Sequence, residues 1–351
     1  MRKFSSWAVF VAILLCVGSV ARSWAAAVDD KAVADFFRGK TVKIIVGFSA
    51  GGGYDAYSRA IARHIHKHIP GNPGVIVENM AGAGSIILAN HMFNAAPKDG
   101  TVIGNFSGQI ILEQLFANPA VQYDLAKFRY LGVPIGETYL LIVTRKSGVT
   151  KLDELLGTKS KQVTVGGIPG STVEQGPLLM RDLLGANIKV VSGYKGTADV
   201  RLAMESGEID GIMNSWESSK VTSLDRIKNG DWQILAQLSD NPVAELPVKN
   251  VPTIGRIAKT EEQRQLLRYG AAAPNQFGKV YVVPAGVPQD RAAALEAALA
   301  KTFADKEFLA EAEKGKLDIE PVSAAQVQKL IIEFFGLPAD LKAKLRKILK
   351  S

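Results

Sequence analysis

The sequence predicts an α/β protein with two lobes, each built on a mainly parallel sheet. Segments typical of strands and helices alternate from residue 41 to residue 103, and the same alternation begins again at residue 139. A chain of 351 residues is long enough to bury two cores. Its composition of 47% hydrophobic and 22% charged residues excludes a disordered protein.

Residues 1–27 have the three parts of a signal peptide. Arg2 and Lys3 give a positive start, an apolar stretch covers residues 7–20, and three alanines at 25–27 form a small-residue cleavage site. The alternative, an uncleaved membrane anchor, needs about 20 apolar residues, which is longer than this stretch. We therefore expect cleavage near residues 25–27 and an exported, soluble mature protein.

The mature chain lacks cysteine and the sequence motifs that bind nucleotides. The only cysteine, Cys16, lies in the predicted signal peptide, so we expect no disulfide, thiolate nucleophile or cysteine-metal site. The phosphate-binding pattern G-x-x-x-x-G-K-[ST] is absent, and neither glycine cluster completes G-x-G-x-x-G. The 42 basic and 34 acidic residues are scattered, which does not suggest nucleic-acid binding. We expect neither a cofactor nor a metal.

Strand and helix patterns follow one another along the chain in two blocks. In the first block, apolar runs and helical periodicity predict strands over 41–46, 75–79 and 101–103 and helices over 55–69 and 85–95. In the second block, strands are predicted over 139–144, 162–165, 188–191, 209–213 and 232–237, and helices over 151–156, 172–184 and 198–206. A strand over 280–283 and a long helix over 289–303 follow.

The two blocks predict how the chain divides between the lobes. We assign residues 28–138 and 239–351 to lobe I and residues 139–238 to lobe II. Two strands, around 139–143 and 232–237, are expected to cross between the lobes and to form a hinge.

A glycine-rich loop covers residues 47–55, between the first strand and the first helix. Its free backbone N–H groups and the start of the following helix favour an anion. Asp55 is either the N-cap of that helix or a contact to a ligand or water. A plain tight turn is the alternative, but three consecutive glycines are more than a turn needs.

Residues 47–51 also fit the G-x-S-x-G motif of hydrolases, with Ser49 as the nucleophile. That chemistry needs a histidine well downstream of the serine, but all four histidines lie within the first 91 residues. His64 and His68 share a helix face at i and i+4, but the glutamate of H-E-x-x-H is absent. A solvated helix face explains these histidines better than a metal site, and an exported hydrolase is the less favoured alternative.

Further short motifs occur in a fixed order along the chain. They are the glycine loop ending at Asp55 with Arg59 after it, Val-Glu-Asn-Met-Ala-Gly-Ala-Gly at 77–84, Ala-Pro-Lys-Asp-Gly-Thr at 96–101, the small-residue loop at 166–172, Tyr-Lys-Gly at 194–196, Gly-Glu-Ile-Asp at 207–210, Asn-Val-Pro-Thr at 250–253, and Phe-Gly at 277–278 with Pro-Ala-Gly-Val-Pro at 284–288. Together they resemble the solute-binding proteins of tripartite tricarboxylate transporters, often called the Bug family.

The resemblance implies a type II periplasmic binding protein of the Venus-flytrap kind. Such a receptor closes on a small carboxylate, such as a di- or tricarboxylate or a related organic acid, and docks on an integral-membrane permease. We expect a monomer and no enzymatic activity. The alternative partner is a two-component kinase, for which the protein is a periplasmic ligand-sensing subunit.

The expected ligand-binding residues come from the ends of strands and the starts of helices. Small polar residues that face each other across a cleft can hold a carboxylate through N–H and hydroxyl donors. The first lobe is expected to contribute Ser49, Ala50, Gly51, Gly52, Gly53, Tyr54 as a wall, Asp55 and Ser107. The second is expected to contribute Gly170, Ser171, Thr172 and Asn214.

Overall fold

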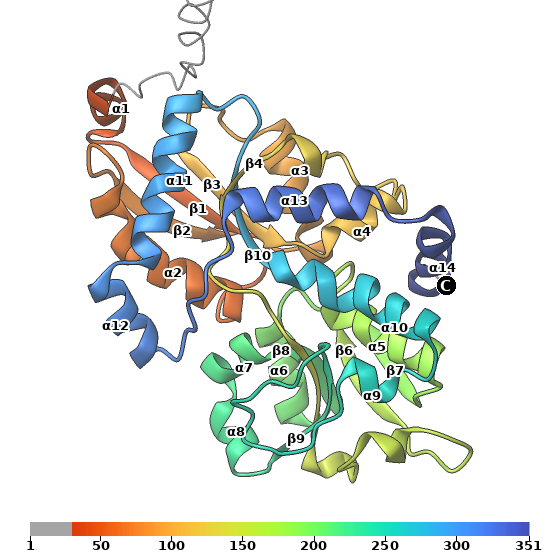
Figure 1. Cartoon of the computed structure of the whole chain (residues 1–351). Helices are drawn as coiled ribbons and strands as arrows, with labels where there is room; N and C mark the ends of the chain where they lie inside the picture. The colour runs from red at the N-terminus through yellow and green to blue at the C-terminus, as the bar shows by residue number, and fades with distance from the viewer. Residues whose placement is uncertain (1–29, 351) are drawn as a thin grey trace, which may run out of the picture.

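The computed structural model describes residues 30–350, so the predicted signal peptide lies outside the described residues. Two five-stranded sheets, each covered by helices, form two lobes joined along one side (Figure 1). Within residues 30–350, no helix is both long enough and apolar enough to cross a bilayer. The prediction of a two-lobed α/β protein is confirmed.

The first sheet has the strand order β2-β1-β3-β10-β4. Its strands are β1 (Thr41–Val46), β2 (Gly74–Asn79), β3 (Val102–Ser107), β4 (Arg129–Gly132) and β10 (Lys279–Val283). β1 pairs in parallel with β2 and β3, whereas β10 pairs antiparallel with β3 and β4. β10, which comes late in the chain, therefore lies between the two early strands β3 and β4.

Helices cover both faces of the first sheet. They are α1 (Asp30–Phe37), α2 (Gly53–Ile65), α3 (Ile86–Asn94), α4 (Ile110–Leu115), α11 (Gln289–Phe303), α12 (Lys306–Lys314) and α13 (Ala324–Phe335). Successive strand residues point to opposite faces. Ile44 therefore packs in one core with α2 and α11, and Ile45 in another with α3 and α13.

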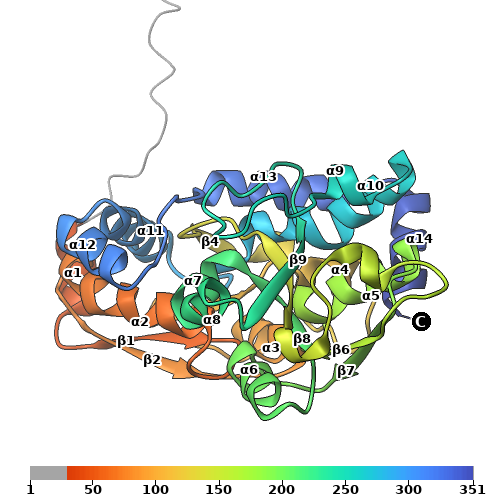
Figure 2. The same cartoon turned by 90° about the horizontal axis from the view of Figure 1, so that it is seen from below.

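The second sheet has the order β7-β6-β8-β5-β9. Its strands are β5 (Tyr139–Thr144), β6 (Val163–Gly167), β7 (Ile188–Ser192), β8 (Gly211–Ser215) and β9 (Trp232–Leu238). The helices beside it are α5 (Thr172–Leu184), α6 (Thr197–Ser206), α7 (Trp216–Thr222), α8 (Leu224–Lys228), α9 (Ile254–Ile257), α10 (Glu261–Leu267) and α14 (Ala339–Leu349). Figure 2 shows α6, α7 and α8 on the side of this lobe seen from below.

Short helical turns connect these elements. They are η1 (His66–His68), η2 (Ala83–Ser85), η3 (Leu125–Lys127), η4 (Arg145–Ser147), η5 (Leu152–Leu155) and η7 (Ala273–Phe277), together with the π-helical turn η6 (Arg268–Ala272).

Each sheet is mixed rather than mainly parallel, because one strand enters it from the other lobe. β10 begins at the junction of the lobes, whereas β1, β2 and β3 end near it, so β10 runs against β3. β5 likewise enters the second sheet from the first lobe and runs antiparallel to β8 and β9. The four-residue β4 was not predicted.

The chain crosses between the lobes outside the strands named for that role. β5 and β9 lie side by side in the second sheet, where Leu140 faces Gln237, so they do not form the crossings. The crossings are the segments 133–138 and 239–278, which join the strands of the two sheets. The prediction that these strands cross between the lobes is therefore wrong, and the crossings lie in the segments next to them.

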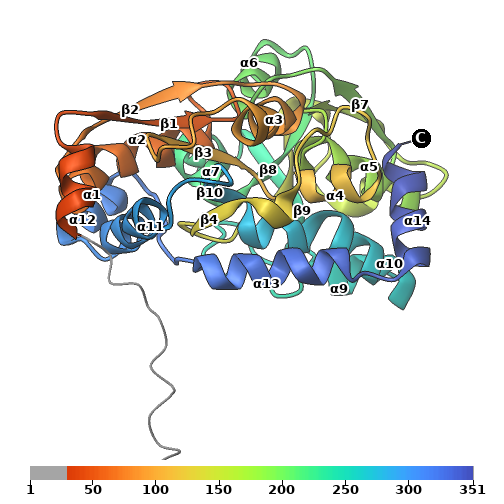
Figure 3. The ribbon, with the colours of Figure 1, turned by 90° about the horizontal axis from the view of Figure 1, so that it is seen from above.

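The contacts between helices indicate which segments belong to each lobe. Helices α10 and α14 pack on α5 of the second sheet, and Figure 3 shows α5 and α14 at the end of the molecule opposite α1 and α11. We propose that lobe II comprises residues 139–277 and α14, which departs from the predicted placement of 239–351 entirely in lobe I.

Candidate functional site

The glycine loop after β1 is held in place by its own helix. α2 begins at Gly53 with Gly52 as its N-cap, so Asp55 lies in the first turn and the predicted N-cap role is wrong. Asp55 Oδ2 accepts hydrogen bonds from the Gly51 N–H at 3.0 Å and from Arg59 Nε at 2.9 Å. Asn79, at the end of β2, donates to Asp55 Oδ1 at 3.0 Å.

These contacts set both the charge and the role of Asp55. Burial acts to raise the pKa of Asp55, but hydrogen bonds from Arg59, the Gly51 N–H and Asn79 outweigh it and hold the pKa below its usual value. Asp55 therefore stays ionised, and its carboxylate holds the glycine loop in place by accepting the Gly51 N–H.

The second lobe closes directly on this loop through α6. The Ser49 hydroxyl donates to Asp199 Oδ2 at 3.0 Å, and Arg201 Nη2 donates to the Gly51 carbonyl at 3.0 Å. The Ser49 N–H also donates to the Lys195 carbonyl at 3.4 Å. The two lobes are thus in contact across the loop, and the structure is a closed form.

A small cavity remains between the lobes at this place. The space open to the centre of a water-sized sphere is about 20 Å³, enough for about one water molecule. Five of the predicted residues line it, namely Gly52, Gly53, Tyr54, Ser171 and Asn214. Six lining residues were not predicted, namely Phe48, Tyr139, Ile168, Val173, Thr197 and Ser218. The lobes must separate before a carboxylate can enter.

The start of α5 forms the second-lobe wall. Ser171 is the N-cap of α5, and its hydroxyl donates to the Ile168 carbonyl at 2.8 Å. The Gly170 N–H, predicted as an anion donor, instead donates to the Glu174 carboxylate at 3.1 Å. A carboxylate of the chain itself thus occupies part of the anion-binding end of this helix in the closed form.

The remaining predicted residues stabilise the surroundings of the cavity. Thr172 Oγ1 donates to Asn275 Oδ1 at 2.9 Å, and the Asn214 amide donates to Ser219 Oγ at 3.0 Å. Ser107 is buried behind the cavity, where its hydroxyl accepts from the Gln109 N–H at 3.2 Å, as a turn serine does. Ser49, Ala50, Gly51, Asp55, Ser107, Gly170 and Thr172 are not among the residues that line the cavity.

Two tyrosines close the apolar side of the cavity. Tyr54 and Tyr139 are both buried, and burial, with the nearby Glu137 carboxylate, raises the pKa of each well above its usual value. The Tyr54 hydroxyl donates to the Gly278 carbonyl at 2.8 Å. Among the described residues that line the cavity, none carries a charged side chain. A ligand there meets neutral donors and aromatic rings.

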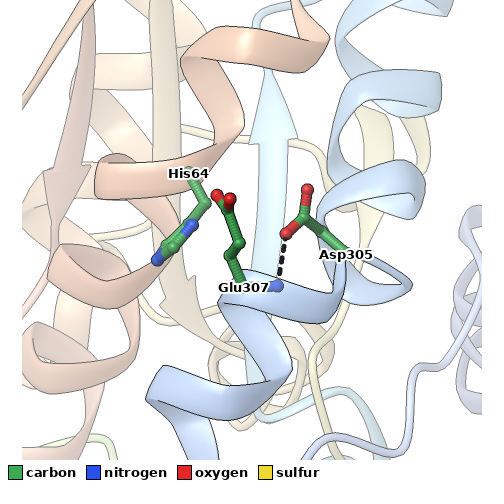
Figure 4. A group of neighbouring side chains, drawn as sticks. All are labelled: His64, Asp305 and Glu307. Carbon is green, nitrogen blue, oxygen red and sulfur yellow. Dashed lines mark hydrogen bonds between the residues drawn. The ribbon is translucent and has the colours of Figure 1, made fainter.

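His64 and His68 belong to a salt-bridge cluster with carboxylates at the start of α12, and neither lines the cavity; Figure 4 shows His64 with Asp305 and Glu307. His64, Asp305 and Glu307 offer ligand atoms within 4.8 Å of one another. Each of them already has a partner. Asp305 accepts from the N–H groups of Glu307 and Phe308 as the N-cap of α12, Lys67 bridges Asp305 and Glu307, and His64 Nε2 lies 2.7 Å from Glu311 Oε2. The cluster joins α2 to α12.

His64 is therefore structural, although it is not on the solvated helix face predicted for it. Its side chain is 12% exposed and its ring meets the edge of Phe308 at 5.7 Å. We expect His64→Ala to lower the free energy of unfolding by about 1–2 kcal/mol, because a partly buried hydrogen bond is lost. Urea unfolding measures this change. Carboxylate binding should be unaffected, and a variant that folds but no longer binds contradicts this assignment. The control is His66→Ala, whose side chain is half-buried and is hydrogen-bonded to Asn72 rather than to α12.

Comparisons with known proteins agree with this architecture. The profile of the family described as Tripartite tricarboxylate transporter family receptor matches residues 58–336. Protein BugT of Bordetella pertussis is 25% identical over 233 residues, which cover 65% of this chain and 69% of that protein.

Solved structures of similar fold include BugD and MatC. The periplasmic binding protein BugD superposes with a TM-score of 0.69 at 19% identity, covering 88% of this chain and 97% of that one. MatC (Rpa3494) from Rhodopseudomonas palustris with bound malate gives a TM-score of 0.65 at 18% identity, covering 88% and 99%. The resemblance inferred from the motifs is confirmed. Because the family profile covers well over half of its length, the chain belongs to the receptor family of tripartite tricarboxylate transporters.

Proposed function

We propose that this protein is an exported receptor that captures a small carboxylate between its lobes and delivers it to an integral-membrane permease of the tripartite tricarboxylate type. The observation that carries the proposal is the cavity at the starts of α2 and α5. A helix N-terminus favours an anion by about 0.3–1 kcal/mol, and by more when it is partly buried. The malate held by MatC supports a carboxylate as the ligand class.

Neutral donors around the cavity suit this ligand class. Hydroxyl groups of Ser171, Thr197 and Ser218 and the amide of Asn214 come from four separate elements of the second lobe. A carboxylate oxygen can accept from several of them at once, as charge-assisted hydrogen bonds do. Gly52, Gly53 and Tyr54 of the first lobe line the same cavity, so a ligand there contacts both lobes and stabilises the closed form.

We propose that the protein has no catalytic role. The Ser49 hydroxyl donates to Asp199, and the nearest histidine in sequence, His64, is engaged by Glu311 at the far end of α2. Incubation with a bound carboxylate, followed by its recovery and mass analysis, tests this proposal. Recovery of the unchanged acid is expected, and a hydrolysis product contradicts it.

A thermal-shift screen over mono-, di- and tricarboxylates tests the receptor function. A ligand at about 100 times its dissociation constant stabilises the folded protein by about 2.7 kcal/mol. At least one di- or tricarboxylate should therefore raise the melting temperature by several degrees, whereas acetate at equal ionic strength should not. No shift with any acid of the panel, confirmed by calorimetry, contradicts the proposal.

We also propose that the chain is exported as a monomer after cleavage near residues 25–27. Mass spectrometry of the periplasmic protein should give an N-terminus near Ala26 or Val28. Retention of Met1 contradicts cleavage, and a dimer in light scattering contradicts the monomer.

Ser171→Ala should weaken carboxylate binding about ten- to a hundredfold. The hydroxyl lies at the N-cap of α5 on the cavity wall, and a hydrogen bond to a charged group contributes about 1.5–3 kcal/mol. Isothermal titration calorimetry measures the affinity. Ser323→Ala is the matched control, because Ser323 caps α13, which is remote from the cavity. Equal affinities for wild type and Ser171→Ala place the ligand elsewhere.

A further inference from the structure

A buried group of charges lies where the chain crosses between the lobes. Glu137, in the crossing segment 133–138, pairs with Lys279, the first residue of β10, and neither side chain is exposed. The Tyr54 hydroxyl of α2 shares its one proton between the Gly278 carbonyl and Glu137 Oε2, which lies 3.1 Å away. The ammonium group of Lys279 is thus matched by one carboxylate.

A second buried carboxylate stands beside this pair without a cation of its own. Glu217, the second residue of α7, is 6% exposed and accepts from its own backbone N–H and from the Thr138 N–H, the latter at 3.1 and 3.3 Å to its two oxygens. Within residues 30–350, no lysine, arginine or histidine makes an ion pair with it. An ionised Glu217 leaves one negative charge unmatched in a buried junction, which disfavours the ionised form.

The groups that face Glu217 come from every neighbouring element. Lys279 of β10, Glu137 of the crossing segment, Tyr57 of α2 and Tyr139 of β5 interact with it electrostatically. On its other side it borders a groove of about 510 Å³ that also contains Glu245, Glu313, Asp318 and Glu320. Lys220, on the same helix, is engaged by Glu245 and Asp318. The acidic groups around Glu217 therefore outnumber the basic ones. The groove also lets water reach the edge of the position that Glu217 occupies.

Closure of the lobes is what buries this carboxylate. α7 belongs to the second lobe and packs on α2 of the first. The contact is close, since a Cβ atom on Gly53 of α2 would lie 2.0 Å from the hydroxyl oxygen of Ser218, the residue after Glu217. Opening the lobes separates these two helices and admits water to Glu217.

We propose that Glu217 couples lobe closure to the uptake of one proton: the closed form holds it as a neutral acid, and the open form releases the proton to water. The proposal deepens the proposed receptor function by naming a regulator of its closing step. It is tested below without any ligand, so its failure and the failure of carboxylate binding are distinguishable.

The pH range follows from the two environments. Burial raises the pKa of Glu217 to about 8 in the closed form, with the Glu137 charge adding to the rise and Lys279 opposing it. A glutamate in water has a pKa of about 4.3. Below about pH 4.3 both forms are protonated, and above about pH 8 both are ionised. Between these values the ratio of closed to open form falls by up to about tenfold per pH unit as the pH rises.

Small-angle scattering of the chain at pH 6 and pH 9, with no added ligand, tests the coupling. The radius of gyration of the wild type should be larger at pH 9. Glu217→Gln, which mimics the neutral acid, should stay compact at both values. The matched control, Glu245→Gln, removes an exposed acid from the same groove and should behave as the wild type. Equal wild-type radii at the two pH values, or a Glu217→Gln variant that still expands, overturn the proposal.

A second measurement guards against a variant that fails to fold. In the wild type labelled with ¹³C-glutamate, the side-chain carboxyl resonance of Glu217, assigned by its loss in Glu217→Asp or Glu217→Gln, should titrate above pH 7. A midpoint near pH 4.3 in the compact protein overturns the proposal even if the radii change.

Discussion

Gly53→Ala should weaken carboxylate binding about 5- to 150-fold, because a single methyl group blocks lobe closure. A Cβ atom on Gly53 would lie 2.0 Å from Oγ and 2.6 Å from Cβ of Ser218 on the opposite lobe. Overpacking of this kind costs about 1–3 kcal/mol, and the closed form bears the whole cost. Alanine also favours a helix over glycine by up to about 1 kcal/mol, so the open form should be no less stable than the wild type. Calorimetry and urea unfolding measure the two effects.

The reason for the loss can be checked with a compensating change. Ser218→Gly removes the opposing side chain together with one proposed hydroxyl donor, so Gly53→Ala should no longer weaken binding when it is added to Ser218→Gly. Gly255→Ala is the matched control, because a Cβ atom there meets nothing closer than 4.0 Å. If the double variant binds much more weakly than Ser218→Gly alone, the clash does not explain the loss.

Lys279→Met should lower the free energy of unfolding by about 3–5 kcal/mol. The substitution leaves Glu137 as a buried charge without its cation, and breaking a buried pair from one side has this cost. It also removes the ammonium group that lies 4.9 Å from the ring centre of Tyr57. Urea or thermal unfolding at neutral pH gives the change directly.

The double variant Lys279→Met/Glu137→Gln should be more stable than Lys279→Met alone, because no charge is then left buried. The surface control is Lys31→Met, whose pair with Asp35 is largely exposed and worth at most about 1 kcal/mol. A Lys279→Met variant as stable as the wild type contradicts the assignment of the pair.

Regular helices and strands could be predicted where the sequence pattern is strong. The helices over 172–184 and 289–303 have the predicted bounds: Ser171 and Gly185 flank the first, and Pro288 directly precedes the second. The four-residue β4 carries no such pattern and gains its place by pairing with β10. The antiparallel course of β10 depends on where the chain re-enters the first lobe, which local periodicity does not record.

The candidate site was predicted in part for the same reason. Gly52, Gly53 and Ser171 lie at helix starts, where sequence patterns point to anion binding. Thr197 and Ser218 line the cavity because the second lobe packs against Gly52 and Gly53 of the first. Such contacts join residues that are far apart in sequence. One signal was present: Thr197 directly follows the Tyr-Lys-Gly motif, and Ser218 lies four residues after Asn214. Asp55 was misassigned because α2 begins two residues before it.

The late insertion of β10 has a consequence for how the chain folds. All strands of the second sheet lie within residues 139–238, so that sheet can form before residue 279 has been synthesised. Until then β3 and β4 each have an unpaired edge, and such edges pair readily with other chains. Closing the long loop between β3 and β10 also slows folding. The first lobe is therefore the slower to complete, and a nascent chain arrested before residue 279 is the species most prone to self-association.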